Sequence, residues 1–281
     1  LAPLAQIANL FGRANNARTS YKRLASFMEE TQSDDLSIKN ENAIRRDKLG
    51  SIEFESTSYR YPEAEIDTLK QINLKIEEGE KVAILGRNGS GKSTLMKLAS
   101  GLFKATDGLV MYDGVDIKQI HSQDISRSIG IVLQDVQLFS GSVRENITMG
   151  REDISEEDLL QAGILSGLDE FISKIPGGYD LVLADGGKGL SGGQRQAIAL
   201  ARAIVHKPSH FILDEPTSAM DMNSENLFIN QVKEILKEST MLVVTHRMPL
   251  LNLVDRVIVM HDGNIVEDGT KEEILKKLNP S

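Results

Sequence analysis

The stretch that decides the fold is GRNGSGKST, at Gly86–Thr94. Its spacing, G-x-x-x-x-G-K-[ST], is that of a phosphate-binding loop (P-loop), in which glycines let backbone N–H groups turn inward toward phosphate oxygens. The loop follows an apolar run at 81–85 and precedes a helix predicted over 94–100. The N-terminus of that helix would add partial positive charge beside the phosphates. The stretch therefore predicts an α/β domain that binds a nucleotide.

Two side chains of the loop have expected roles of their own. Lys92 is expected to reach the β- and γ-phosphates, where it neutralises charge. Ser93 is expected to place its hydroxyl on Mg²⁺. A nucleoside triphosphate with Mg²⁺ is therefore the predicted ligand.

A second apolar strand ends in two adjacent acids, in the sequence FILDE at 211–215. Asp214 is expected to hold Mg²⁺ as the second acidic position of a P-loop enzyme. Adjacent residues of a strand point to opposite faces, so Glu215 can share that site only if the strand has already ended. Pro216 favours such an ending because it cannot extend a central strand. Glu215 is therefore a candidate general base for an attacking water.

The third motif is LSGGQ at Leu190–Gln194, which begins a helix predicted over 191–205. Ser191 and two glycines ahead of a helix make a second cradle of backbone N–H groups. The chain thus carries two predicted phosphate-binding surfaces that lie far apart in sequence.

Together these motifs resemble the ATP-binding cassette (ABC) ATPases, whose signature is LSGGQ, and the resemblance runs from about Ser51 to Leu275. It implies an α/β fold: a P-loop NTPase core with an antiparallel β subdomain and an inserted α-helical subdomain. It also implies ATP and Mg²⁺ as cofactors. In this family two cassettes dock head to tail, so the resemblance implies a second identical cassette as partner.

Shorter motifs follow in the order of the family. Tyr61 matches the aromatic that stacks on adenine, with Tyr59 as its near competitor. Gln134 matches the glutamine that contacts Mg²⁺ and the attacking water. The segment 218–221 matches the loop that crosses the dimer interface, and His246 matches the histidine that touches the γ-phosphate. Four other histidines match no motif and are expected to be structural: His121, His206, His210 and His261.

The resemblance implies the following site residues. The catalytic residues are Glu215, His246, Lys92 and Gln134. The nucleotide-binding residues are Tyr61, Gly86, Arg87, Asn88, Gly89, Ser90, Gly91, Lys92, Ser93, Thr94, Gln134, Ser191, Gly192, Gly193, Gln194 and Asp221. The Mg²⁺ ligands are Ser93, Gln134 and Asp214.

Apolar periodicity indicates how the chain is organised. Residues 1–29 carry an apolar stripe at helical spacing. Such a helix either packs on its own domain or continues from a membrane domain, and we expect the tail of a transmembrane domain that precedes this sequence. Residues 30–48 are polar and are typical of a linker. The ATPase domain is expected over 49–281, with a core at about 49–133 and 206–281 and a helical subdomain at about 134–205.

Within this domain, strands are expected at 51–61, 69–76, 211–213, 241–244 and 256–260, and a hairpin is expected at 111–117 with its turn at Asp113-Gly114. The stretch 153–175 is expected to be rich in helices, because Ser155 and the acids that follow it are typical of a helix start. Another helix is expected at 223–238.

Composition excludes several classes of protein. The 281 residues include Lys+Arg 32 and Asp+Glu 41, a net charge of −9, which disfavours a broad basic nucleic-acid surface. There is no cysteine, which excludes disulfides and thiolate metal sites. No apolar run approaches the ~20 residues that span a bilayer. We expect no nucleic-acid partner.

Within the family, the segment FSGSVRENI at 139–147 and Gly178-Tyr179-Asp180 resemble exporters. Asp185 stands about where exporters usually carry Glu. The segments 217–221 and 245–250 are similar to the ATPases of bacterial type I protein-secretion exporters. The expected function is therefore the motor domain of an ABC exporter at the cytoplasmic face of the inner membrane, with a fused transmembrane domain and secretion accessory proteins as partners.

Three alternatives remain. A stand-alone importer ATPase would normally begin near Ser51 without a leader helix. A chromosome-maintenance ATPase would place a long coiled coil between the P-loop and the signature, and no heptad array occurs there. A regulatory module without turnover would be expected to lack Lys92, Glu215 or His246. The transported substrate is not specified by these residues.

Overall fold

The computed structural model of the chain describes residues 43–183, 185–218 and 220–278, without the side chain of Asp185. The helix expected at 1–29 and residues 30–42 of the linker expected at 30–48 lie outside these residues. The chain divides into two units, Leu1–Ala43 and Ile44–Ser281, and the second is described here.

A six-stranded sheet forms the centre of this unit, in the order β12-β11-β3-β10-β9-β6. Its strands are β3 (Lys81–Gly86), β6 (Ile129–Val132), β9 (His210–Asp214), β10 (Thr240–Val244), β11 (Arg256–His261) and β12 (Asn264–Thr270). All neighbouring pairs are parallel except β11 with β12. The carboxyl ends of five parallel strands therefore meet at one edge of the sheet, which is the edge where ligands bind in open α/β folds.

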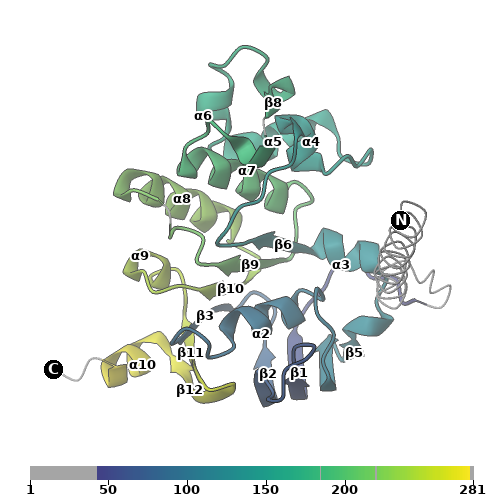
Figure 1. Cartoon of the computed structure of the whole chain (residues 1–281), viewed down its shortest axis with the longest axis vertical. Coiled ribbons are helices and arrows are strands. Elements are labelled where there is room, and N and C mark those ends of the chain that lie inside the picture. The colour runs from purple at the N-terminus through teal and green to yellow at the C-terminus, as the bar shows by residue number, and fades with distance from the viewer. Residues whose placement is uncertain (1–42, 184, 219, 279–281) are drawn as a thin grey trace, which may run out of the picture. The chain divides into compact units, whose positions relative to one another are not determined.

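Both faces of this sheet are covered, which explains why its strands are apolar runs rather than alternating patterns. Val82 and Ile84 of β3 belong to one buried cluster with α2 (Lys92–Ala99). Ala83 and Leu85 belong to a second cluster with α7 (Gly192–Ile204) and α8 (Met222–Ile235). Because successive strand residues point to opposite faces, α2 and α7 pack on opposite sides of the sheet. Figure 1 shows α7 and α8 above the strands and α2 below them.

An antiparallel sheet covers the same side as α2, in the order β2-β1-β4-β5. It consists of β1 (Ile52–Tyr59), β2 (Leu69–Ile76), β4 (Asp107–Tyr112) and β5 (Val115–Asp116). Between β4 and β5, Asp113 and Gly114 have φ of 50° and 72°. Both central residues of a type I′ hairpin need this left-handed conformation, so the turn predicted at Asp113-Gly114 is confirmed. The antiparallel β portion expected of the fold is thus present.

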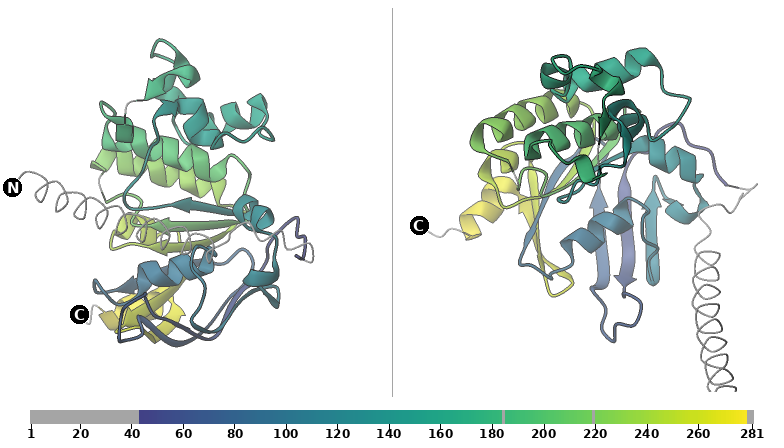
Figure 2. Two further views of the ribbon diagram at one scale, coloured as in Figure 1. Left: turned by 45° about the vertical axis from the view of Figure 1, so that its right-hand side comes forward. Right: turned by 45° about the horizontal axis from the view of Figure 1, so that its top comes forward.

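Helices dominate the segment between β6 and β9 (Figure 2). They are α4 (Val143–Thr148), α5 (Glu156–Leu165), α6 (Asp169–Ile172) and α7, with two short strands, β7 (Gly141–Ser142) and β8 (Val182–Leu183). Ser155 caps α5 by accepting a hydrogen bond from Asp158 N, at the N-terminus predicted from its acids. Helices α4 and α5 pack on α7.

Several boundaries differ from the predicted ones. The first strand ends at Tyr59 rather than Tyr61, and the hairpin strand begins at Asp107 rather than Met111. The stretch 153–175, expected to be rich in helices, contains α5 and α6, which are separated at Gly167, where φ is 70°. The elements that were not predicted are β6, β7, β8, β12, α4, α3 (Ser122–Ser128), α9 (Met248–Leu251), α10 (Lys271–Leu278) and the 3₁₀ turns Ile117–Gln119, Gly178–Asp180 and Asp185–Gly187.

Candidate nucleotide-binding site

The predicted loop follows β3 and leads into α2. Gly86 and Gly91 have φ of 150° and 101°, in the region open to glycine. A Cβ on Gly86 would lie 2.4 Å from Met260 O, and a Cβ on Gly91 would lie 2.6 Å from Leu69 Cδ2. Neither position can therefore accept a side chain. Between these two glycines, Arg87, Asn88 and Gly89 are exposed.

Lys92 is buried, at 6% exposure, and its ammonium group donates hydrogen bonds to loop carbonyls. The distances from Nζ to Gly86 O and Arg87 O are 2.9 and 3.1 Å. Among the described residues, the recorded hydrogen-bond partners of this cation are thus neutral carbonyl groups. This arrangement suits an anion that would bring the missing countercharge.

Helix α2 begins at Gly91 without a side-chain cap, so its first N–H groups are not satisfied by a capping side chain. Ser93 in the first turn is exposed. Thr94 is buried, and its Oγ1 lies 3.1 Å from the hydroxyl of Tyr61. The uncapped start of α2 agrees with the predicted binding of phosphate, and the exposure of Ser93 agrees with its predicted role as a Mg²⁺ ligand.

The register of the parallel strands brings the other predicted groups to the same edge. Val244 of β10 pairs with Ile84 of β3 on one side and with Asp214 of β9 on the other. Two residues beyond Val244 is His246, and one residue beyond Asp214 is Glu215. Sheet geometry therefore places the loop, the two acids and the histidine on neighbouring strand ends.

Glu215 lies just beyond the end of β9, as the prediction for Pro216 required. Its φ is 43°, a left-handed conformation that is strained for a residue other than glycine. Its backbone N–H donates to Val244 O at 2.9 Å, which continues the sheet contact for one more residue. The carboxylate Oε1 lies 3.5 Å from His246 Nε2. The structure thus brings the predicted base and the predicted histidine together.

Gln134 is exposed, two residues past the end of β6. Val132 of β6 pairs with Leu213 of β9, so Gln134 follows the strand next to the two acids. Between the two competing tyrosines the structure discriminates clearly. Tyr59 is 8% exposed and stacks on Phe103, whereas Tyr61 is 36% exposed. Tyr61 therefore has ring surface available for a base, and Tyr59 belongs to the core.

The signature motif begins α7 with a capping box. Ser191 Oγ accepts from Gln194 N at 3.2 Å, and Gln194 Oε1 accepts from Ser191 N at 2.8 Å. Gly192 and Gly193 open the first turn of the helix, where N–H groups lack intrahelical partners. Since α7 and α2 cover opposite faces of the sheet, this second cradle is not brought to the loop of the same chain.

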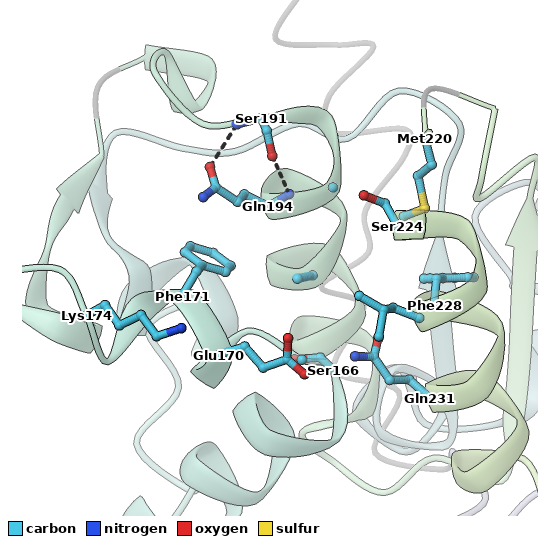
Figure 3. Close-up of a pocket in the computed structure, with 14 residues that line it drawn as sticks. Ser166, Glu170, Phe171, Lys174, Ser191, Gln194, Met220, Ser224, Phe228 and Gln231 are labelled. Carbon is cyan, nitrogen blue, oxygen red and sulfur yellow. Dashed lines mark hydrogen bonds between the residues drawn. The ribbon is translucent and has the colours of Figure 1, made fainter. Parts of the chain in front are cut away.

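A cavity of about 250 Å³ lies beside the signature, between α6, α7 and α8 (Figure 3). Phe171, Met220 and Phe228 supply its apolar lining. Of the described residues that line it, none belongs to the loop 86–94. The cavity is therefore separate from the predicted phosphate site of this chain. Met220 stands where leucine is commoner in the family, a change that conserves volume.

Asp221 caps α8. Its Oδ1 accepts from the backbone N–H of Ser224 and Asn223, at 3.0 Å each, and its Oδ2 accepts from Ser224 Oγ. These hydrogen bonds, foremost that from Ser224 N, lower the pKa of Asp221. Any contact of Asp221 across a dimer interface would be made by a carboxylate already held in place.

The residues at the strand ends fit Mg²⁺ bound together with a nucleotide. Within the described part of the chain, no group of three His, Asp or Glu side chains is placed to hold a metal ion by itself. Mg²⁺ usually keeps several waters and uses one or two carboxylates plus substrate phosphates. Asp214 and the exposed Ser93 provide one carboxylate and one hydroxyl, a small set of protein ligands of the kind that Mg²⁺ uses beside phosphates. When bound, the ion would draw charge from the phosphates.

Sequence reasoning missed a buried cluster beside this site. Glu225 of α8 accepts hydrogen bonds from Thr217 and Arg247, the residues that follow Glu215 and His246 closely in the chain. No local spacing links residues 22 positions apart, so the contact could only come from the fold.

Comparisons with known proteins agree with this geometry. The family model described as "ABC transporter" matches residues 69–218. The cyclolysin secretion/processing ATP-binding protein CyaB of Bordetella pertussis is 39% identical over 277 residues, which is 97% of this chain and 38% of the relative. The putative multidrug export ATP-binding/permease protein YgaD of Bacillus subtilis is 37% identical, over 83% of this chain and 40% of the relative. The chain thus spans about two fifths of the length of these curated relatives.

Among solved structures, a bacterial Atm1-family ABC exporter with ATP bound superposes with a TM-score of 0.79 at 27% identity. The match covers 94% of this chain and 47% of that one. Among the described residues, no helix combines the length and apolar character needed to cross a membrane. From the loop, the strand-end acids, the signature helix and these matches together, we conclude that the chain belongs to the ABC transporter family, as an ATPase domain.

Proposed function

We propose that this chain is the motor domain of an ABC exporter, and that it hydrolyses Mg·ATP at sites shared between two copies of itself. The observation that carries the proposal is the placement of the two N–H cradles. The loop precedes α2 on one face of the central sheet, and the signature begins α7 on the other. One chain therefore cannot close both cradles on one triphosphate, whereas two chains related head to tail can.

The roles of the side chains follow from their positions. Lys92 and the N–H groups of the loop bind the β- and γ-phosphates and neutralise their charge, which carries most of phosphoryl-transfer catalysis. Tyr61 offers its exposed ring to the adenine. Asp214, Ser93 and Gln134 hold Mg²⁺, which supplies charge neutralisation when it is bound.

Water attacks the γ-phosphate directly, and no phosphoenzyme forms. Glu215 accepts a proton from this water at its carboxylate, and His246, 3.5 Å from that carboxylate, contacts the γ-phosphate. The signature of the second chain completes the site from the other side. ATP then binds the closed pair more tightly than the open one, and only such a difference in affinity can drive a conformational cycle.

The likeness to export proteins supports coupling of this cycle to export through a transmembrane domain, at the cytoplasmic face of the inner membrane. The match to CyaB over 97% of the chain favours secretion of a protein substrate, with secretion accessory proteins as further partners. The alternative is a stand-alone importer ATPase, and the resemblance of the segment 139–147 to exporters argues for the exporter. Reconstitution with the flanking membrane spans, followed by assay of substrate efflux from vesicles, separates the two.

Glu215→Gln tests the mechanism. Loss of a general base slows turnover by about 10²-fold or more, while ATP binding stays close to that of the wild-type chain. Phosphate release and binding of a fluorescent ATP analogue measure the two quantities. Lys92→Ala, as a comparison, is expected to lose both together. A Glu215→Gln chain that releases phosphate at the wild-type rate would refute the assignment of the base.

A further inference from the structure

A buried carboxylate bridges the segments that follow Glu215 and His246. Glu225 lies in the first turn of α8, and its side chain is 9% exposed. Its Oε1 accepts a hydrogen bond from Thr217 Oγ1 at 2.8 Å, and its Oε2 accepts one from Arg247 Nη1 at 2.9 Å. Each oxygen of this carboxylate is thus committed to a different loop.

Arg247 adds further contacts to the same bridge. Its Nη2 donates to Ser218 O at 3.2 Å, so the guanidinium spans both the carboxylate and the backbone of the loop after Glu215. Its backbone N–H donates to the Oγ1 of Thr245, a buried side chain. A planar fork with two donors on two different acceptors defines an orientation that a lysine could reproduce only in part.

The loops that the bridge joins are those that carry the proposed chemistry. Thr217 comes two residues after Glu215, and Arg247 comes directly after His246. The same two loops also meet through their catalytic side chains, since the carboxylate of Glu215 lies 3.5 Å from His246 Nε2. Glu215 itself holds a left-handed φ of 43°, which persists only where the surroundings enforce it.

An ion pair with one buried member is a weak way to gain stability, because apolar side chains of similar volume often serve a fold as well. Its consequence here is geometric, since it sets the distance between two strand-end loops. We propose that Glu225 and Arg247 are positioning residues for hydrolysis, which hold Glu215 and His246 at a working separation. This inference rests on the proposed function, and neither residue is assigned a contact with the nucleotide.

Steady-state kinetics of the full chain test the proposal through the split between kcat and KM. Glu225→Met removes both acceptors of the bridge, and Arg247→Met removes both guanidinium contacts. Each is expected to lower kcat at least about tenfold, because a small misplacement of catalytic groups is costly in rate. KM for ATP and binding of a fluorescent ATP analogue should change less than about twofold, because neither substitution removes a contact with the bound nucleotide. The double variant should be no slower than the slower single variant, because both remove one bridge.

Controls separate positioning from folding. Arg256→Met removes comparable, partly buried ion pairs with Asp268 and Glu80. Arg256 is the first residue of β11, at the opposite edge of the sheet from the carboxyl ends of the strands that carry Glu215 and His246. This substitution should lower the melting temperature and leave kcat unchanged. Arg247→Lys should retain an intermediate kcat, and it decides between positioning and folding if Glu225→Met does not fold.

Folded variants that keep the wild-type kcat, or that lose nucleotide affinity in step with turnover, would overturn the proposal. A wild-type chain that fails to hydrolyse ATP would instead refute the proposed function.

Discussion

Glu215 and His246 meet through the backbone of two neighbouring strands. Asp214 and Val244 are paired in register, so the residues beyond them are carried to one place. The left-handed φ of Glu215 then turns its side chain off the line of the strand. Asp214 and Glu215 can therefore serve one site although they are adjacent. At this scale the prediction from Pro216 succeeded because a proline ends a strand for steric reasons that act locally.

Another histidine, His210, has a purely structural environment, as expected from its lack of a motif. It is fully buried, its Nε2 lies 2.6 Å from Gly50 O, and its ring packs edge-on against Tyr112. Burial lowers the pKa of His210 to about 4, against an ordinary value near 6.5. Between these two values the unfolded chain binds the proton and the folded chain does not. The free energy of unfolding therefore falls as pH drops through this window, by about 3 kcal/mol in all.

Denaturant unfolding at a series of pH values between 4 and 7 checks this expectation. His210→Gln should lose the part of the decline that this ring contributes between pH 6.5 and 4, about 3 kcal/mol, whatever its stability at neutral pH. The exposed His261, changed to Gln, serves as the matched control and should keep the wild-type decline. Equal pH dependence in the His210→Gln and wild-type chains would show that the buried ring does not carry this linkage.

At the scale of elements, the strands and helices that could be predicted are those with a local sequence pattern, such as alternation or an apolar run beside a turn. Strand β3 was found because an apolar run leads into the glycine loop, and β2 was found with its full bounds because it alternates along one buried face. Strand β6 was missed because it has only four residues, one of them Gly130, and no turn signal before it. Strand β12 was missed because it is an edge strand with a polar sequence, half exposed along its length. The bridge through Glu225 was missed because tertiary contacts leave no periodic signal.

The signature helix allows an element-scale test because a second helix has the same cap. Ser142 and Glu145 form a capping box at α4, as Ser191 and Gln194 do at α7. Ser142→Ala and Ser191→Ala should each lower the free energy of unfolding by about 1 kcal/mol through the lost cap. Only Ser191→Ala should also lower the rate of ATP hydrolysis, because only that cap belongs to a proposed phosphate cradle. Thermal melts and phosphate release measure the two effects. Equal rates of ATP hydrolysis in the two variants would contradict a role for the signature motif in the phosphate site.

At the scale of the whole molecule, the central sheet separates the phosphate-binding loop from the signature motif, although the proposed hydrolysis needs both around one ATP. Val82 and Ile84 face the side of α2 with the loop, and Ala83 and Leu85 face the side of α7 with the signature. The motifs could be recognised from sequence, but their placement on opposite faces follows only from the alternation of buried strands between two layers. The proposed pair of chains related head to tail would resolve this separation and would make two equivalent sites, since both chains would carry Glu215 and His246.

The most direct test of this account mixes two inactive chains, Lys92→Ala and Ser191→Arg, at high protein concentration with Mg·ATP. If sites are shared, a mixed pair holds one doubly damaged site and one intact site. Random pairing at equal amounts makes half of the pairs mixed, so about a quarter of the wild-type rate of phosphate release should return. Each variant alone should stay inactive, and native mass spectrometry should show the mixed pair. Absence of any recovery in a sample that contains the mixed pair would contradict the shared site.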